Sequence, residues 1–244
     1  GAGSDVLDGG DDRDLVSWAY AGNGITFLAD SFATVTVTVA PGDTDTLASI
    51  EDAEGTSGDD VLWGDTGANW LVGGQGFDTI RGGGGNDLLM GGGRSGMLDE
   101  ASRDTADYSY ADAALDITLD PNGGATVVVG AGDTDTILGF ADLVGGEGGT
   151  RDDTLVGNEL DNVLDGGAGS DTLRGGEGND FLFGYGGDNT ADYGYLSTPV
   201  TVSLDRNAHV TVTLASGDTD TLSGIAHLVG GGGADVLSGD ASLN

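Results

Sequence analysis

Acidic and amide side chains recur every nine residues in two stretches of the chain, and this spacing is the feature best suited to chemistry. In the first stretch these residues are Asp60, Asn69, Asp78, Asp87 and, after eight extra residues within Gly91–Asp107, Asp104. In the second stretch they are Asp153, Asn162, Asp171, Asp180 and Asn189. Carboxylate and carbonyl oxygens are the ligands that calcium prefers, with about six to eight per ion at roughly 2.3–2.6 Å. The spacing therefore predicts calcium sites, provided that the fold brings these side chains into register.

Each of these residues is the sixth of a nine-residue pattern, Gly-Gly-x-Gly-x-Asp-x-U-x, in which U is a large aliphatic residue. Two copies follow one another directly, at Gly73–Arg81 and Gly82–Met90. Further copies lie at Gly55–Trp63, Gly64–Val72, Gly148–Val156, Gly157–Asp165, Gly166–Arg174, Gly175–Phe183 and Gly230–Ser238, with a degenerate pair at Gly1–Asp8 and Gly9–Ser17. Glycine allows a tight turn at positive φ, whereas x-U-x is strand-like with U pointing inward. Two nonapeptides thus predict one flattened coil of about 18 residues, with a loop before each strand.

Stacked coils of this kind lie about 4.7–4.9 Å apart, so sixth positions two repeats apart meet at one edge. The predicted pairs are Asp60 with Asp78, Asn69 with Asp87, Asp78 with Asp104, Asp153 with Asp171, Asn162 with Asp180, and Asp171 with Asn189. Asp78 and Asp171 each belong to two of these pairs. An ion fits between two such carboxylates, glycine carbonyls can complete its shell, and without it the like charges would repel. At least six calcium ions are therefore expected.

The sites containing Asn are expected to be weaker, because an amide keeps a carbonyl ligand but carries no charge. Asp and Asn also form Asx turns, although turns alone do not require Asp in register every nine residues. Equivalent positions in the incomplete arrays add Asp5, Asp14 and Asp235 to the candidate ligands. A second group of candidates comes from a repeated acidic string and comprises Asp43, Asp45, Asp133, Asp135, Asp218 and Asp220.

That acidic string, G-D-T-D-T, marks a longer period, because it occurs at Gly42–Thr46, Gly132–Thr136 and Gly217–Thr221. Each module runs from a nonapeptide array through an aromatic residue (Trp18, Tyr108 or Tyr193) into alternating strands. Turns are expected at Asp120–Gly123 and Asp205–Asn207. The predicted segments are nonapeptide arrays at 1–17, 55–107, 148–192 and 230–244, joined by strand-rich coils at 18–54, 108–147 and 193–229. One continuous solenoid with wider coils between arrays is expected; the alternative is an array interrupted by side hairpins.

Composition bounds the function. The net charge is −35, from 42 acidic residues against seven Arg and no Lys, which argues against binding nucleic acid or inserting into an anionic membrane. The Asp enrichment would also fit a salt-adapted protein. The nonapeptide repeats account for the enrichment equally well. The chain has no Cys, so calcium rather than disulfides would cross-link it. No apolar run approaches membrane-spanning length and no signal peptide is visible.

The nonapeptides, together with the D-T-A-D-Y-S-Y string at Asp104–Tyr110, resemble the RTX (repeats-in-toxin) family of hemolysin-type calcium-binding repeats over essentially the whole chain. The resemblance implies an all-β fold, a right-handed parallel β-roll or β-solenoid. It also implies calcium-dependent folding outside the cell, type I secretion, and a secreted or cell-surface location. Departures from the family pattern are Asn at 69, 162 and 189, Asp12 and Arg151 for Gly, and Tyr185 for Gly. They bear on individual affinities rather than on the fold.

No catalytic constellation is visible. The strings H-E-x-x-H and G-x-S-x-G are absent, and without Lys there is no Walker-type loop or Schiff base. His209 lies in an alternating strand and His227 in an aliphatic segment, so both are interpreted as structural. The chain is therefore not expected to be an enzyme, although a flanking catalytic domain would be compatible with it.

Three functions fit the sequence. The first is a calcium-binding structural solenoid in a larger secreted or cell-surface protein, of the adhesin or extracellular matrix and surface-layer type. The second is the C-terminal secretion and folding module of an exported hydrolase. The third is a glycan- or ligand-binding module. The chain begins and stops inside a repeat, at Gly1 and Asn244, so a longer polypeptide is expected.

Aromatic residues at positions other than U are the feature that bears on the third function. They are Trp63, Trp70, Phe77, Phe181 and Phe183. Exposed, they could stack on sugars or contact a partner; alternatively, a second layer covers them. Besides calcium, the candidate partners are glycans and neighbouring copies or modules of the same protein.

Overall fold

The computed structural model describes residues 2–30, 34–93, 103–148, 151–205 and 209–239. All regular elements in these ranges are β-strands, which confirms the predicted all-β class. These described residues contain no helix with the length and apolar character needed to cross a membrane. The chain divides into two compact units: unit 1 comprises Gly1–Asp107 and Asn122–Phe140, and unit 2 comprises Tyr108–Pro121 and Ala141–Asn244.

Unit 1 is built from short strands stacked in parallel sheets. Its strands are β1 (Val6–Asp8), β2 (Leu15–Ser17), β3 (Thr26–Leu28), β4 (Val35–Ala40), β5 (Asp43–Ala48), β6 (Asp52–Glu54), β7 (Val61–Trp63), β8 (Trp70–Gly74), β9 (Thr79–Arg81), β10 (Leu88–Gly92), β11 (Thr105–Asp107), β13 (Ala125–Gly130) and β14 (Asp133–Leu138). One sheet of this unit has the order β13-β14-β10-β8-β6-β2. In another sheet β11, β9, β7 and β3 are consecutive neighbours, and β1, β5 and β4 form a third.

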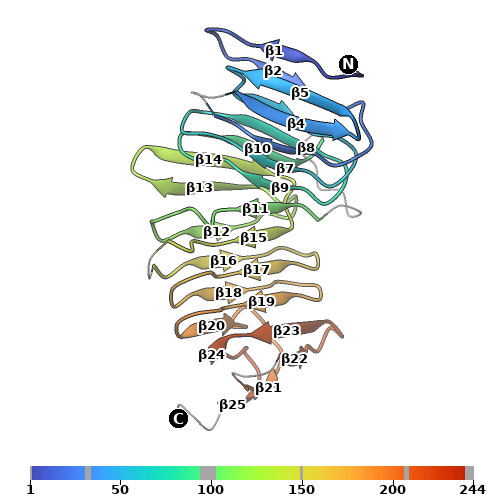
Figure 1. Ribbon diagram of the computed structural model, residues 1–244. Coiled ribbons are helices and arrows are strands. Elements are labelled where there is room, and N and C mark those ends of the chain that lie inside the picture. The colour runs from blue at the N-terminus through green and yellow to red at the C-terminus, as the bar shows by residue number, and fades with distance from the viewer. Residues whose placement is uncertain (1, 31–33, 94–102, 149–150, 206–208, 240–244) are drawn as a thin grey trace. The chain divides into compact units, whose positions relative to one another are not determined.

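Unit 2 repeats this plan. Its strands are β12 (Asp116–Thr118), β15 (Asp142–Val144), β16 (Thr154–Val156), β17 (Val163–Asp165), β18 (Thr172–Arg174), β19 (Phe181–Phe183), β20 (Asn189–Asp192), β21 (Thr201–Ser203), β22 (Val210–Thr213), β23 (Thr219–Ser223), β24 (Ile225–Val229) and β25 (Val236–Ser238). In Figure 1, β16, β18 and β20 succeed one another on one side of this unit, and β17 and β19 on the other. The first set belongs to a sheet of order β12-β16-β18-β20-β24.

The strand register shows a coil of 18 residues. Val61 pairs with Thr79, and Thr154 pairs with Thr172, so each strand meets the strand two repeats later in a parallel ladder. The strands themselves are only three to five residues long in the arrays, because the glycine loop interrupts each one.

The U positions form the core of each coil, as the pattern predicts. Leu62, Leu71, Ile80 and Leu89 in unit 1 are completely buried, as are Leu155, Leu164 and Leu173 in unit 2. Each lies in the middle of a strand, and in most of these strands the side chains on either side of it are more exposed. Full burial of an aliphatic side chain contributes about 1.5–3 kcal/mol, so stacked U residues are a main source of stability that does not depend on metal.

The strand-rich segments add antiparallel hairpins to the roll. β4 pairs antiparallel with β5, β13 with β14, and β22 with β23. The second strand of each hairpin pairs in parallel with a repeat strand: β5 with β1, β14 with β10, and β23 with β19. The hairpins turn at Gly42, Gly132 and Gly217, which have φ of 83°, 84° and 103°.

In these segments the structure differs from the strand pairing expected from the sequence. Strand β12 does not pair with β13 across the turn that begins at Asp120; it pairs in parallel with β16. The hairpins form through the G-D-T-D-T strings instead, so side hairpins and coil strands coexist in the strand-rich segments. The eight-residue insertion after Gly91 and part of the expected turn at Asp205–Asn207 lie outside the described residues.

Candidate metal centre

The sixth-position side chains stack into a ladder at each edge of the coils. Oδ1 of Asp78 accepts a hydrogen bond from the backbone N of Asp60 at 2.8 Å, and Oδ1 of Asp104 accepts one from Asp78 N at 2.9 Å. In unit 2 the same bond joins Asp171 Oδ1 to Asp153 N at 2.9 Å. Each carboxylate is thus held against the sixth residue two repeats earlier, which is the predicted pairing.

The ladder side chains are inside the molecule rather than on its surface. No sixth-position residue between Asp60 and Asn189 is more than 3% exposed. The residues concerned are Asp60, Asn69, Asp78, Asp87, Asp104, Asp153, Asn162, Asp171, Asp180 and Asn189. A buried carboxylate costs several kcal/mol unless it is paired, so the partners of its second oxygen decide what the ladder can bind.

Four ladder residues, called the central rungs from here on, have a second oxygen without a hydrogen-bond donor. Oδ2 of Asp78, Asp87, Asp171 and Asp180 is buried and accepts no hydrogen bond. It lies against the first glycine of its own repeat: a Cβ on Gly73 would be 2.1 Å from Asp78 Oδ2 and 2.6 Å from the carbonyl O of Gly91. Two oxygens with no hydrogen between them therefore converge on the space that only glycine leaves open.

The electrostatics of these rungs also favour a bound cation. Burial, reinforced by neighbouring carboxylates, raises the pKa of Asp78 and of Asp180 to about 8. The same causes raise the pKa of Asp87 to about 7 and that of Asp171 to about 6. Burial thus works against the charged form of each group, most strongly at Asp78 and Asp180, and a bound cation would favour that form instead.

The donor set fits calcium. It consists of carboxylate and carbonyl oxygens, which are the hard ligands of that ion. Among the described residues no group of three or more His, Cys, Asp or Glu side chains is arranged around one point. Loop carbonyls such as that of Gly91 would therefore have to supply much of the shell, with Asp78 and its equivalents supplying the charge.

In each array, the first carboxylate on one edge differs from the central rungs in its hydrogen bonds. Asp60 accepts from Ile25 N at 2.7 Å and from Thr56 N at 2.6 Å, so both of its oxygens have donors. Asp153 likewise accepts from Leu115 N and Gly146 N, both at 2.8 Å. The ladder begins at these rungs because a buried aliphatic residue, Ile25 or Leu115, takes the sixth position in the preceding coil.

The repeat that contains Asp153 also has a longer loop than its sequence pattern indicates. Gly145 takes the place of the first glycine, because a Cβ there would lie 2.7 Å from Asp153 Oδ2. Gly148, where the pattern places the start of this repeat, instead lies beside Asp112. Three extra residues in the loop shift the apparent phase without moving the strand.

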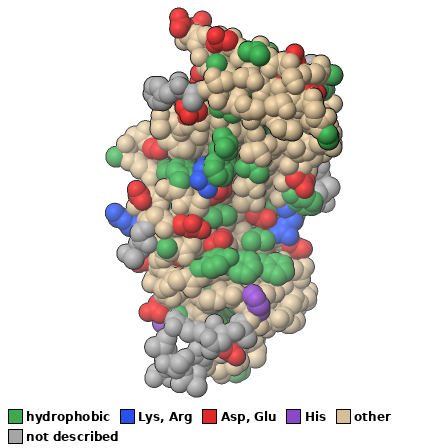
Figure 2. Space-filling view, in the orientation of Figure 1, with side chains coloured by type: hydrophobic (Ala, Val, Ile, Leu, Met, Phe, Trp, Pro, Cys, Tyr) green, Lys and Arg blue, Asp and Glu red, His purple; other side chains and the backbone are tan. Residues whose placement is uncertain are grey.

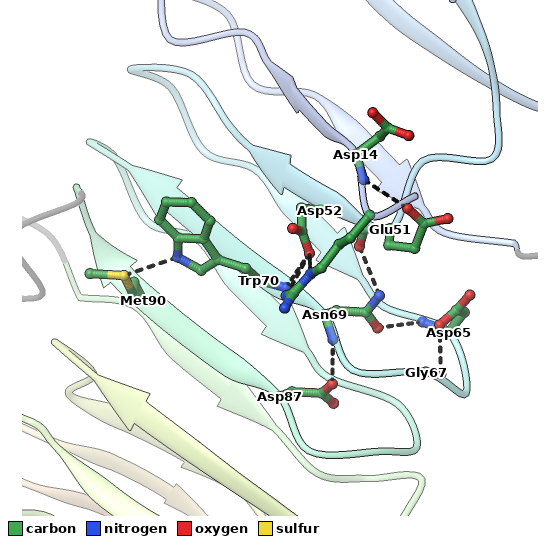
Figure 3. Close-up of polar contacts among 10 residues, drawn as sticks. Asp14, Glu51, Asp52, Asp65, Gly67, Asn69, Trp70, Asp87 and Met90 are labelled. Atoms are coloured by element: carbon green, nitrogen blue, oxygen red, sulfur yellow. Dashed lines mark hydrogen bonds and ion pairs between the residues drawn. The ribbon is translucent and has the colours of Figure 1, made fainter. Parts of the chain in front are cut away.

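On the other edge of unit 1, Asn69 follows Glu51, whose Oε2 accepts from the backbone N of Asp14 at 3.0 Å (Figure 3). Its Oδ1 accepts from Asp65 N at 2.9 Å, and its Nδ2 donates to the carbonyl O of Glu51 at 2.7 Å. Its backbone N donates to Asp87 Oδ1 at 2.8 Å. Asn162 makes the same contacts in unit 2, with Nδ2 donating to Ala141 O at 2.6 Å and the backbone N to Asp180 Oδ1 at 2.9 Å. In both amides the oxygen accepts from the loop of its own repeat, and the NH₂ group donates to a carbonyl of the preceding coil.

The G-D-T-D-T strings supply further rungs. Asp45, Asp135 and Asp220 occupy sixth positions, with their Oδ1 atoms accepting from the backbone N of Asp5, Asp87 and Asp180 at 3.1, 2.9 and 3.1 Å. Asp87 and Asp180 therefore have ladder neighbours on both sides, whereas the sequence assigned each to one internal pair. The reason is the hairpin, whose second strand enters the roll in register with the repeats.

The remaining candidates divide into three groups. Asp14 and Asp235 lie beside the first glycine of their own repeats, because a Cβ on Gly9 or Gly230 would lie 2.6 or 2.3 Å from their Oδ2. Asp43, Asp133 and Asp218 lie two residues before the ladder positions; Asp43 Oδ2 accepts from Gly3 N at 3.0 Å. Asp5 lies in the loop before β1, one rung before Asp45.

Sequence reasoning missed the hydrogen-bond donors that meet the hairpin carboxylates. Trp18 Nε1 donates to Asp45 Oδ2 at 2.9 Å, and Tyr193 OH donates to Asp220 Oδ2 at 2.9 Å. Both aromatic side chains are only 1% exposed. The recurrence of an aromatic residue and of G-D-T-D-T in each module was a usable signal, but their distance in sequence hid the contact.

Aromatic side chains outside the core are unevenly covered. Phe77 is 55% exposed, whereas Trp63 is half-buried beneath the Arg81 guanidinium, 4.3 Å from its ring, and Trp70 Nε1 contacts Met90 S at 3.3 Å. In unit 2, Phe181, Phe183 and Tyr185 form a row with ring centroids 6.3 and 6.1 Å apart. Figure 2 shows such hydrophobic side chains gathered in patches among acidic ones on the face in view.

The fold and the site together define a class: an all-β roll of short strands with buried carboxylates beside its glycine loops. The family model described as RTX calcium-binding nonapeptide repeat (4 copies) matches residues 1–17, 48–79, 63–93, 147–182, 156–191 and 220–242, more than half of the chain. The chain therefore belongs to the RTX calcium-binding repeat family.

Comparison with solved structures finds the crystal structure of extracellular lipase LipA from Serratia marcescens, with a TM-score of 0.30 and 17% sequence identity. The match covers 71% of this chain and 37% of the lipase chain, so the present chain spans little more than a third of that protein. No significant match is found among curated proteins.

Proposed function

We propose that this chain is a calcium-folded structural solenoid within a larger secreted or cell-surface protein, of the adhesin or surface-layer type. The observation that carries the proposal is the set of buried carboxylate oxygens, at Asp78, Asp87, Asp171 and Asp180, that have no hydrogen-bond donor. Membership of a calcium-binding repeat family supports calcium as the ion.

The mechanism follows from the stacking of the coils. Asp78 is held by Asp60 N on one side and faces the Gly91 carbonyl on the other. An ion at that position would join consecutive coils through charge, while Leu62 and Ile80 join them through apolar contact. Outside the cell, where calcium is abundant, the ions would stabilise the native state by mass action and release the like-charge repulsion.

The experiment is a calcium titration followed by circular dichroism. In excess chelator the chain should be largely unstructured, and the β signal should appear cooperatively as calcium is added. A chain that shows the full β spectrum in chelator would exclude calcium as the main organiser of the fold. The alternative, a folding module of an exported hydrolase, makes the same prediction here and is separated from it by the sequence flanking residues 1–244.

A further inference from the structure

One asparagine of the second array donates hydrogen bonds at the position where the acidic repeats leave an oxygen without a donor. Nδ2 of Asn189 lies 2.6 Å from the carbonyl O of Gly184, 3.1 Å from that of Gly224 and 3.3 Å from that of Gly186. Relative to its own loop, this nitrogen takes the place that Oδ2 takes in Asp78, because a Cβ on Gly184 would lie 2.4 Å from it.

The orientation of this amide is fixed from both sides. Oδ1 of Asn189 accepts from Asp171 N at 2.7 Å, the ladder bond that every central rung makes. A flipped amide would set its oxygen against three carbonyl oxygens and its NH₂ against an N–H group. The NH₂ group therefore faces the carbonyls, and it carries the positive end of the amide dipole into the space where other rungs present only oxygens.

The opposite edge of the same coil ends in a similar way. Asp220 follows Asp180 in the ladder, and its Oδ2 accepts from the hydroxyl of Tyr193 at 2.9 Å. Tyr193 is buried, and its hydroxyl is a hydrogen-bond donor aimed at this oxygen. Trp18 serves Asp45 in the same way in unit 1.

We infer that the ladder of unit 2 has a built-in stop at Asn189 and Asp220, an inference that rests on the proposed calcium function. There the NH₂ group of Asn189 and the hydroxyl of Tyr193, both neutral hydrogen-bond donors, take the place of the cation. No ion binds between Asn189 and Gly224, because the NH₂ group already satisfies the three carbonyls and would repel a cation. The amide carbonyl of Asn189 is thus a hydrogen-bond acceptor for Asp171 rather than a weak calcium ligand. With this stop, β24 can pair with β20 at the end of the array without a further calcium ion between the two coils.

The test counts the calcium ions bound per chain, by isothermal titration calorimetry and by equilibrium dialysis, for the wild type and three variants. Asn189→Asp replaces the NH₂ group by a carboxylate oxygen and should bind one ion more than the wild type. Asn189→Ala removes the amide without adding a ligand and should bind the same number as the wild type, with a lower Tm in saturating calcium. Asn23→Asp adds an equal charge at an exposed position and should leave the count unchanged.

Each outcome decides the matter. One ion lost in Asn189→Ala would show that Asn189 is a ligand in the wild type and would overturn the inference, as would an unchanged count in Asn189→Asp. The alanine variant keeps the test valid if the aspartate variant does not fold. A wild-type chain that binds no calcium at all would defeat the proposed function instead, so the two failures are distinguishable.

Discussion

At the scale of single residues, the second oxygen of each ladder carboxylate decides its role. At Asp60 and Asp153 both oxygens have backbone donors, and at Asp220 a phenol hydroxyl completes the set. At Asp78 and Asp171 one oxygen has no donor and faces its own glycine. Residues with the same place in the nonapeptide thus divide into structural acceptors and candidate metal ligands.

This difference predicts the effect of a conservative substitution at a central rung. In Asp78→Asn the new NH₂ group can donate to the Gly91 carbonyl, as that of Asn189 donates to Gly224, so the coil should still fold in saturating calcium. The variant should bind at least one ion fewer, and the calcium midpoint for folding should rise on the order of tenfold, about 1.4 kcal/mol. Circular dichroism and calcium counting measure the two effects.

Asp11→Asn is the matched control, because it removes one charge from an exposed side chain. Its calcium midpoint should stay at the wild-type value. An ion count equal to the wild type in Asp78→Asn would remove Asp78 from the candidate ligands.

At the scale of elements, the glycine loop is what allows carboxylate and carbonyl oxygens to meet. A Cβ on Gly82 would lie 2.2 Å from Asp87 Oδ2 and 2.9 Å from its Cγ, and both atoms belong to a side chain that is held in the ladder. Gly84, two residues later in the same repeat, has its nearest neighbour at 3.6 Å and is not at positive φ. The two glycines therefore serve different purposes: Gly82 leaves room for the ladder, and Gly84 only continues the loop.

Substitution of these two glycines separates the effects. Gly82→Ala should lower the stability in saturating calcium by about 1–3 kcal/mol or more, because the methyl group displaces the Asp87 carboxylate. Gly84→Ala should leave stability unchanged or slightly raised, since the new residue restricts only the unfolded chain. Thermal unfolding of both variants in calcium provides the comparison. Equal losses in both would mean that the loop backbone, rather than the space beside Asp87, sets the requirement.

At the scale of the whole molecule, the excess of acidic residues and the absence of Cys leave a cation as the natural cross-link. A net charge of −35 opposes compaction, and part of that charge is buried in the ladders. The size of the cation matters, because a magnesium ion requires oxygens at about 2.0–2.1 Å in an octahedron and loses its water reluctantly. Carboxylate and carbonyl oxygens fixed by coil stacking suit the longer and more variable calcium distances.

Magnesium should therefore support folding poorly. At matched concentrations, calcium should restore the β spectrum in a chelator-treated sample that has been dialysed, whereas magnesium should restore only a small part of it. Sodium chloride at equal ionic strength controls for simple screening of the acidic surface. Equivalent folding in magnesium and calcium would contradict the assignment of the ladder oxygens to calcium.

The sequence by itself determined the coil and most of the ladder. The nine-residue period specifies a repeat strand, an inward aliphatic residue such as Leu62 or Leu155, and a carboxylate at each loop, and these are local properties of glycine and strand geometry. The pairing of Asp60 with Asp78 follows from that period alone, because two repeats make one coil.

The tertiary structure decided where each ladder starts and stops. Asp135 and Asp220 enter the ladder only because β14 and β23 fold back as hairpin strands and take the register of the repeats. Trp18 and Tyr193 reach Asp45 and Asp220 from 27 residues away in sequence. Such contacts depend on how whole strands stack, which no nine-residue pattern encodes. A repeat specifies the inside of an array, whereas its ends are defined by whatever non-repeating residues pack against them.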